Sequence, residues 1–183
     1  VTDPFDHREA GYEPLKLRAD VVTVSHDTPS HNFTDGVKGT EHVLDGPGEF
    51  EIGGVFITGI QTNHRNGKEE TPRNTLFVFD YNGVNIAHLG DLSHVLTQAE
   101  VEALGSVNVA LVPVGDGSSL NAAKAAEVIS LIEPNIVIPM HYATPDGRLA
   151  LDPLSKFLKE MGLAEEEKSP SLKVTGTSNL PEE

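Results

Sequence analysis

The chain has 183 residues, of which 28 are acidic and 13 are Lys or Arg, so its formal net charge at pH 7 is −15. This acidic balance argues against binding to nucleic acid or to an anionic membrane, both of which attract clustered Lys and Arg. The absence of cysteine excludes disulfides, iron–sulfur clusters, Cys-ligated zinc and a thiol nucleophile. We expect residues 1–183 to form a single domain, located in the cytoplasm.

Short strands are predicted in the first half of the chain. The Val-rich run 19–25 has the length and composition of a buried strand. Two hairpins are expected, one around Gly53-Gly54 and one around Asn82-Gly83, because these dipeptides favour tight hairpin turns. The strands of these hairpins are predicted at 49–52, 55–58, 74–80 and 84–88.

Helices and strands alternate in the second half. The helices are predicted at 97–104, 121–132 and 152–161, and the strands at 107–114, 135–140 and 172–177. Thr97 with a Glu three residues later is typical of a capping box. Asp152 is expected to cap the last helix, with Pro153 at its first helical position. This order of elements predicts an α/β fold with mixed sheets.

Chemically useful side chains directly follow several of the apolar runs. They are His26 and His31, His64, Asp91 and His141. If the strand ends meet at one edge of a sheet, these groups form a cluster of imidazoles around one carboxylate. Such nitrogen and oxygen donors suit zinc, manganese or iron, and a shared carboxylate can bridge two cations. The alternative for each His alone is a hydrogen-bonded loop residue.

The pattern resembles that of the metallo-β-lactamase superfamily, in the branch of stand-alone metal-dependent hydrolases that includes L-ascorbate-6-phosphate lactonase-like proteins. In that family a strand ends in His-x-His-x-Asp-His, and a His, a Gly-Asp and a last His follow. Here the pattern reads His26-x-Thr28-x-Ser30-His31, His64, Gly90-Asp91 and His141, and Thr2-Asp3-Pro4 resembles an early family segment. The resemblance implies an αββα sandwich with metals at one edge of the two sheets. Because the chain starts at Val1, we expect its start to be trimmed and the first N-terminal hairpin to be lacking.

The resemblance also implies one or two divalent cations, with two ligand positions changed. Thr28 stands where the family has His, and Ser30 stands where it has Asp. The remaining ligands would be His26, His64 and Asp91 for one cation, and His31, Asp91 and His141 for the other. Three protein ligands with an open position are sufficient for a catalytic site. A Ser hydroxyl, however, cannot accept a proton near pH 7 as the Asp would. His88 and His94 flank the Gly-Asp turn and are expected around the ligands, as hydrogen-bond partners or pocket wall.

Two functions therefore remain open. The first is a hydrolase in which metal-activated water attacks an ester, lactone or phosphoester of a small molecule, with Asp91 as catalytic residue and with activity impaired by Thr28 and Ser30. The second is a catalytically degenerate or inactivated member that acts as a binding or scaffold protein. A homo-oligomer formed through an exposed sheet edge is a further hypothesis.

Overall fold

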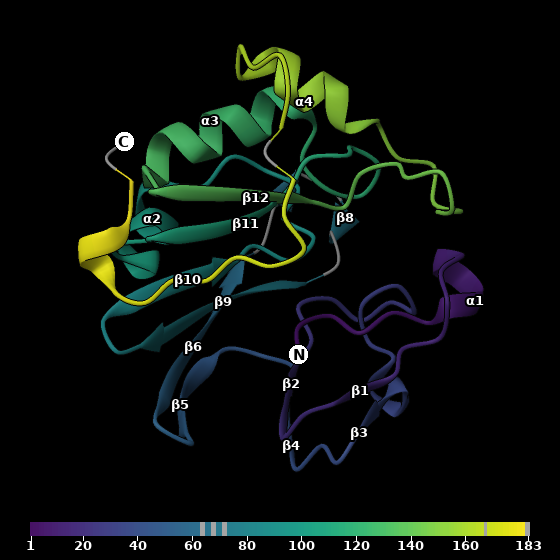
Figure 1. The fold of residues 1–183 in the computed structure, drawn as a ribbon, viewed down its shortest axis with the longest axis vertical. Coiled ribbons are helices and arrows are strands. Elements are labelled where there is room, and N and C mark those ends of the chain that lie inside the picture. Colours follow the sequence, from purple (N-terminus) through teal and green to yellow (C-terminus); the bar gives the residue numbers. More distant parts are fainter. Residues whose placement is uncertain (63–64, 67–68, 71–72, 167, 182–183) are drawn as a thin grey trace.

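The computed structural model describes residues 1–62, 65–66, 69–70, 73–166 and 168–181. Its centre is a six-stranded mixed sheet with the order β12-β11-β10-β9-β6-β5 (Figure 1). The strands are β5 (Gly48–Ile52), β6 (Val55–Thr62), β9 (Asn74–Tyr81), β10 (Val84–His88), β11 (Val109–Pro113) and β12 (Ile136–Met140). The pairs β10–β11 and β11–β12 are parallel, and the other pairs in this sheet are antiparallel. The three parallel strands therefore have their carboxyl ends at the same edge.

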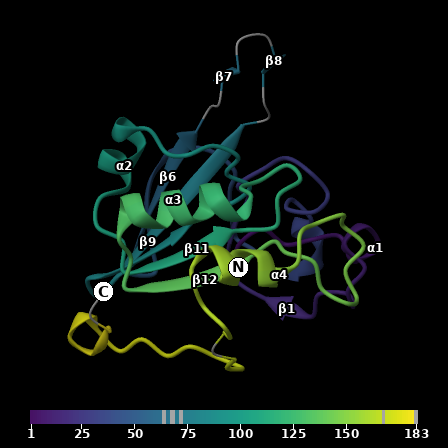
Figure 2. The same ribbon diagram turned by 90° about the horizontal axis from the view of Figure 1, so that it is seen from above.

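Helices pack on one face of this sheet (Figure 2). They are α2 (Gln98–Leu104), α3 (Ala122–Ile132) and α4 (Leu154–Glu160). Val128 and Ile132 of α3 join Leu76, Val112 and Phe157 in the largest apolar cluster, so burial of this face holds the helices on the sheet. Among the described helices, none is both long and apolar enough to span a lipid bilayer.

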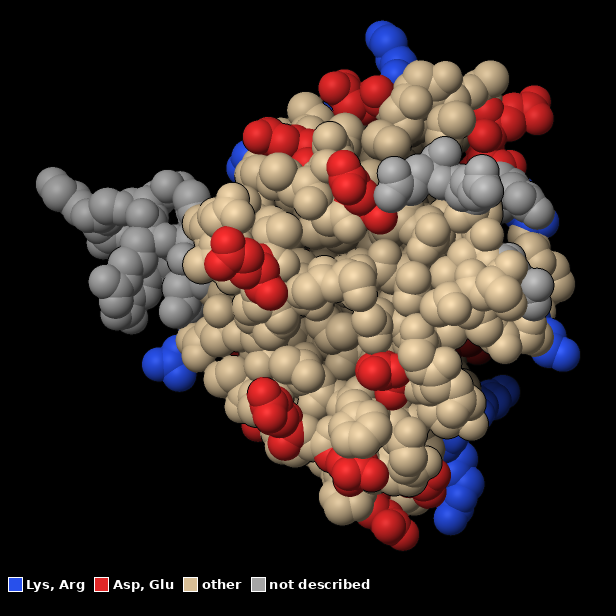
Figure 3. All heavy atoms as spheres, turned by 90° about the vertical axis from the view of Figure 1, so that its left-hand side faces the viewer, with Lys and Arg blue, Asp and Glu red and all other residues tan. Residues whose placement is uncertain are grey.

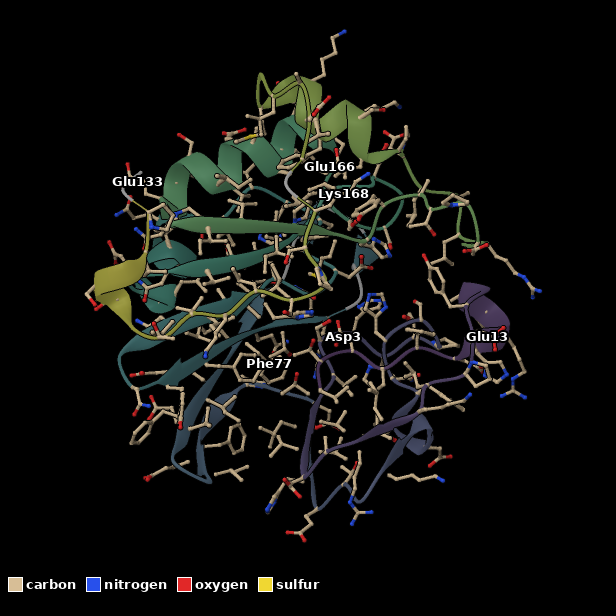
Figure 4. The ribbon with its side chains drawn as sticks, viewed as in Figure 1. Asp3, Glu13, Phe77, Glu133, Glu166 and Lys168 are labelled. Carbon is tan, nitrogen blue, oxygen red and sulfur yellow. The ribbon has the colours of Figure 1, made fainter. Side chains whose placement is uncertain are left out.

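Short strands form a second layer on the opposite face. They are β1 (Leu17–Arg18), β2 (Val21–Thr23), β3 (Val37–Lys38) and β4 (His42–Leu44), paired as the parallel ladders β1–β3 and β2–β4. Side chains of a strand alternate between faces, so Phe77 of β9 points away from the helices, while its neighbours Leu76 and Val78 join the helical cluster. Phe77 packs instead with Leu44 and Ile57 (Figure 4).

The smaller elements complete the chain. They are α1 (His7–Ala10), the 3-10 turns η1 (Thr34–Gly36) and η2 (Thr177–Asn179), and the two-residue strands β7 (Arg65–Asn66) and β8 (Glu69–Glu70). The amino-terminal residues lie along β2, because the Val1 amine donates to the carbonyl oxygen of Val21 and Thr2 bridges to Thr23. Asp3 is thereby held next to the end of β2.

Most predicted elements are confirmed. The α/β class with mixed sheets is observed, both hairpins form, and Asn82 and Gly83 both have the positive φ that their turn requires. The capping box of α2 forms between Thr97 and Glu100. The predicted strand 19–25 is shortened to β2, because the chain leaves the ladder with β4 after Thr23.

The predictions for residues 172–177 and for the start of the last helix are wrong. Residues 172–177 form no strand, because they lie largely exposed with Leu172 at 53% and make no ladder within the described chain. Pro153 is the N-cap of α4 rather than its first helical residue. Asp152 does not cap this helix, since its carboxylate binds the Lys156 amine at 2.6 Å and its backbone N–H donates to the Gly115 carbonyl.

Candidate metal centre

Most of the predicted ligands meet where strands of the two layers end. One ligand atom each from His31, Asp91 and His141 lies within 4.8 Å of the other two. The His31 ring is 5.5 Å from the His141 ring and 5.9 Å from the His26 ring, measured between centroids. His64 lies outside the described residues. Ligand atoms of three of the predicted residues, His31, Asp91 and His141, thus lie close together, and the His26 ring lies beside that of His31.

The turn after β10 directs Asp91 into this cluster. Gly90 has φ +57°, and a Cβ there would collide with the side chains of Ser25 and Asn74, so only glycine fits. The Asn74 side chain spans the turn, because its amide donates to the Leu89 carbonyl at 3.1 Å and its oxygen accepts from the Asp91 N–H at 2.8 Å. The sequence offers no signal for this role of Asn74, which depends on the pairing of β9 with β10.

His141 is placed by an unusual backbone at the end of β12. Its φ is +53°, which is uncommon for a residue with a side chain. Gly115, which follows β11, faces this residue, and a Cβ at position 115 would collide with the His141 carbonyl oxygen. Such a strained conformation persists only where its surroundings enforce it, and here the close approach of Gly115 contributes.

Hydrogen bonds determine which ring nitrogen two of the histidines present. His26 Nδ1 lies 3.1 Å from the Arg73 carbonyl oxygen, which only accepts, so Nδ1 carries the proton. His141 Nδ1 lies 3.0 Å from Ser119 Oγ. Because Ser119 donates its single proton to the Asp116 carbonyl at 3.1 Å, it accepts from His141 Nδ1. A neutral ring whose proton is on Nδ1 has its lone pair on Nε2, which is one of the two ring atoms that can bind a metal.

The two changed positions contact the third histidine. His31 Nδ1 lies 2.8 Å from Ser30 Oγ and 3.1 Å from Thr28 Oγ1, and the two hydroxyls lie 3.0 Å from each other. These side chains therefore hold the His31 ring at its Nδ1 side, and Nε2 remains for a ligand. Thr28 and Ser30 thus position the His31 ring, a role that the sequence did not predict.

The electrostatics of the cluster suit a cation. Asp91 Oδ1 is buried, has no hydrogen-bond partner among the described residues and lies 3.8 Å from His141 Nδ1. A buried carboxylate oxygen without a donor is costly, and a cation would remove that cost. Burial lowers the pKa of His31 and of His141, which favours the neutral form of the ring that a metal requires. The donor set present therefore fits a divalent metal.

A buried acid–histidine pair lies beside the cluster. Asp3 accepts from the Ser25 backbone N–H at 2.7 Å and from its hydroxyl, and burial raises the pKa of this carboxyl (Figure 4). His88 Nε2 lies 4.0 Å from Asp3 Oδ2, and burial lowers the pKa of His88 to about 4. His94 binds the Glu100 carboxylate at 3.1 Å, at the start of α2. Of the two predicted surrounding histidines, His88 therefore neighbours Asp3, and His94 supports a helix cap.

A pocket opens beside the ligands, which we call the aromatic pocket. Its volume is about 440 Å³. Ser30, His31, His88, His141 and Asp3 line it on the side of the cluster. Its other lining residues include Phe5, Tyr12, Tyr142, Leu149 and Leu151. A substrate bound there would lie against the candidate metal ligands.

Residues that sequence reasoning missed include Ser119 and Asn74. The signal available for Ser119 is its place in the Gly-rich segment after β11, where strand-end loops gather around a site. For Asp3, the Thr2-Asp3-Pro4 match was available, but its contact with Ser25 becomes visible only in the fold.

Comparisons with known proteins place this geometry in a family. The family described as the beta-lactamase superfamily domain matches residues 1–141. A UPF0173 metal-dependent hydrolase of Thermococcus onnurineus is 33% identical, with 88% of this chain and 84% of that protein covered. A second one, from Pyrococcus abyssi, is 30% identical over 143 residues. This chain spans 63% of the length of the Pyrococcus protein.

Solved structures give the same result. A Thermotoga maritima protein described as a candidate Zn-dependent hydrolase of the metallo-β-lactamase superfamily is 40% identical, with a TM-score of 0.68 over 87% of this chain and 74% of that one. A candidate metal-dependent hydrolase from Parabacteroides distasonis has a TM-score of 0.62 over 79% and 72% of the two chains, and at 15% identity it supports the fold alone. The resemblance predicted from the sequence is confirmed, and the chain belongs to the metallo-β-lactamase superfamily.

Proposed function

We propose that the protein is a metal-dependent hydrolase of a small molecule, with one divalent cation held by His31, Asp91 and His141. The observation that carries this proposal is the convergence of three ligand atoms within 4.8 Å of one another, together with a buried Asp91 oxygen that has no hydrogen-bond partner in the described part of the chain. A divalent cation at such a site activates water for attack and polarises the bond that is attacked. Zinc, manganese and iron all suit two imidazoles and one carboxylate.

The chain's own residues prepare this site. Asp91 offsets the charge of a cation, and Ser119 holds His141 with Nε2 available. Asp3 and His88 add a buried carboxyl and a neutral imidazole next to the ligands. By the family resemblance, Ser30 stands at the position of a carboxylate that would accept the proton of the attacking water, and its hydroxyl cannot do so near pH 7. We therefore infer a slow hydrolase.

The surface supports a small substrate rather than nucleic acid. On the face shown in Figure 3, acidic side chains are scattered over the surface, and the visible Lys and Arg lie towards its rim. With a formal net charge of −15, the chain would repel a phosphate backbone.

A specific observation also supports the second function, a protein that binds without catalysis. The hydroxyls of Thr28 and Ser30 bind His31 Nδ1 and each other, so both changed positions are used structurally. A protein that had lost its activity could keep this arrangement.

Hydrolysis assays separate the two functions. The protein is loaded with Zn²⁺ or Mn²⁺, and release of p-nitrophenol from p-nitrophenyl phenylacetate and from bis(p-nitrophenyl) phosphate is compared with release by the Asp91→Ala variant. We expect metal-dependent turnover of one of them that Asp91→Ala abolishes. Equal rates in both proteins, or no effect of the metal, would refute the hydrolase and leave the binding function.

A further inference from the structure

The aromatic pocket has walls that suit an apolar guest. Its volume of about 440 Å³ lies in the range of small-molecule sites. Phe5 and Tyr12 come from the N-terminal segment, and Tyr142, Leu149 and Leu151 come from the loop after β12. Apolar and aromatic groups gain free energy by leaving water for such walls.

Contacts within the wall hold it in shape. The rings of Phe5 and Tyr12 meet edge to face, with centroids 5.5 Å apart. The Tyr12 hydroxyl lies 2.7 Å from Thr144 Oγ1, which connects the N-terminal segment to the loop after β12. A wall that is already ordered costs less conformational entropy when a ligand binds.

The charge of the pocket disfavours anions. Among the described residues that line it there is no Lys or Arg, and its carboxyl group is that of Asp3. The nearby Arg8 of α1 is bound to the Asp6 carboxylate at 2.7 Å. Phosphoesters are bound in proteins by Arg and Lys as well as by metal ions, and apart from the proposed cation the described lining offers an anion no such partner to replace its hydration.

Building on the function proposed above, we propose that the aromatic pocket binds the apolar or aromatic group of an uncharged carboxylic ester and discriminates against phosphoesters. In the reaction, the oxygen of water bonds to the acyl carbon and the bond from the acyl carbon to the ester oxygen breaks. One proton of water passes to the departing alcohol oxygen, so the products are a carboxylic acid and an alcohol. Water is the only co-reactant.

Binding of two matched probes tests the pocket apart from catalysis. Uncharged phenylacetamide and anionic phenylphosphonate share the phenyl ring, and each is titrated into the protein by NMR, first without added metal and then with Zn²⁺. Without added metal, we expect phenylacetamide to bind at least about tenfold more tightly than phenylphosphonate. Equal or tighter binding of phenylphosphonate, or no binding of phenylacetamide at about 10 mM, would overturn the proposal.

A charge placed in the wall provides the matched comparison. Leu149 lines the pocket and is 37% exposed, so Leu149→Arg adds a cation there with little cost to folding. We expect this variant to gain about tenfold in phenylphosphonate affinity, while Leu163→Arg, at an exposed leucine after α4, leaves both affinities unchanged. If Leu149→Arg and Leu163→Arg changed the phenylphosphonate affinity equally, the proposed role of the pocket wall would be contradicted.

The two proposals fail in different ways. Discrimination between the probes without metal-dependent hydrolysis of either p-nitrophenyl substrate leaves the pocket's preference in place and refutes the hydrolase. Metal-dependent hydrolysis of bis(p-nitrophenyl) phosphate together with a preference for phenylphosphonate supports the hydrolase and refutes the carboxylic ester as its substrate.

Discussion

Ser119 is expected to control metal affinity although it is not itself a ligand. Its Oγ lies 3.0 Å from His141 Nδ1 and donates to the Asp116 carbonyl, which makes His141 the donor and leaves Nε2 free. Ser119→Ala removes the acceptor. The His141 ring is then free to rotate or to change tautomer, and either change reduces the fraction of molecules that present Nε2 to a cation.

The magnitude follows from the bonds that are lost. Ser119 is 5% exposed, so water replaces its oxygen poorly, and the substitution leaves His141 Nδ1 with an unsatisfied proton at a cost of about 1–3 kcal/mol. Removing such a supporting partner typically weakens metal binding about 10–100-fold. We expect a loss of Zn²⁺ affinity in this range, with a smaller effect on the thermal midpoint.

Competition with a chromophoric chelator measures this affinity directly. Ser118→Ala is the matched control, because the neighbouring hydroxyl is exposed and should leave Zn²⁺ affinity unchanged. A Co²⁺-loaded sample adds a spectroscopic readout, since altered His141 coordination shifts the visible absorption bands. If Ser119→Ala binds Zn²⁺ as tightly as the Ser118→Ala protein, the tautomer argument is wrong.

Three further predictions concern other parts of the site. Thr28→His combined with Ser30→Asp should raise the bound metal per chain, measured by mass spectrometry, and an unchanged content would contradict the resemblance-based assignment of these positions. Burial lowers the pKa of His88 from near 6.5 in the unfolded chain to about 4 in the folded chain. The folded state therefore favours the neutral ring, and this contribution to the free energy of unfolding is fully present above pH 6.5. About 3 kcal/mol of the free energy of unfolding is lost as the pH falls through 4. Urea titrations from pH 7 to pH 4 should show this loss, and His88→Gln should reduce it; an unchanged pH dependence would count against the burial argument. Gly115→Ala should lower both the thermal midpoint and Zn²⁺ affinity, whereas Gly46→Ala, with open space around it, should change neither; equal effects would show that the close approach at position 115 is unimportant.

Local sequence patterns are sufficient to predict the elements that depend on the burial of apolar residues or on the backbone preferences of turn residues. The turns at Gly53-Gly54 and Asn82-Gly83 both form, because positive φ values at these positions are compatible with few other residues. The segment 172–177 contains residue types that favour strands, but it remains largely exposed and pairs with no strand in the described structure. A strand depends on a partner, and a single segment carries no information about one.

The same distinction applies to the site. The convergence of His31, Asp91 and His141 could be predicted because each follows a strand, and strand ends share an edge. The roles of Ser119 and Asn74 could not, because each depends on contacts across the fold rather than on neighbours in sequence. Hydrogen bonds of this kind become visible only when the strands are in register.

The metal content of the purified protein tests the central claim most directly. Protein purified without chelator is analysed by mass spectrometry for zinc, manganese and iron, beside His141→Ala and Asp91→Ala variants whose folding is checked by circular dichroism. The account predicts about one equivalent of divalent metal in the unaltered protein and a large loss in both variants, because each retains only two of the three ligands. An unaltered protein that holds no metal after incubation with Zn²⁺, Mn²⁺ or Fe²⁺, or folded variants that keep a full equivalent, would contradict it.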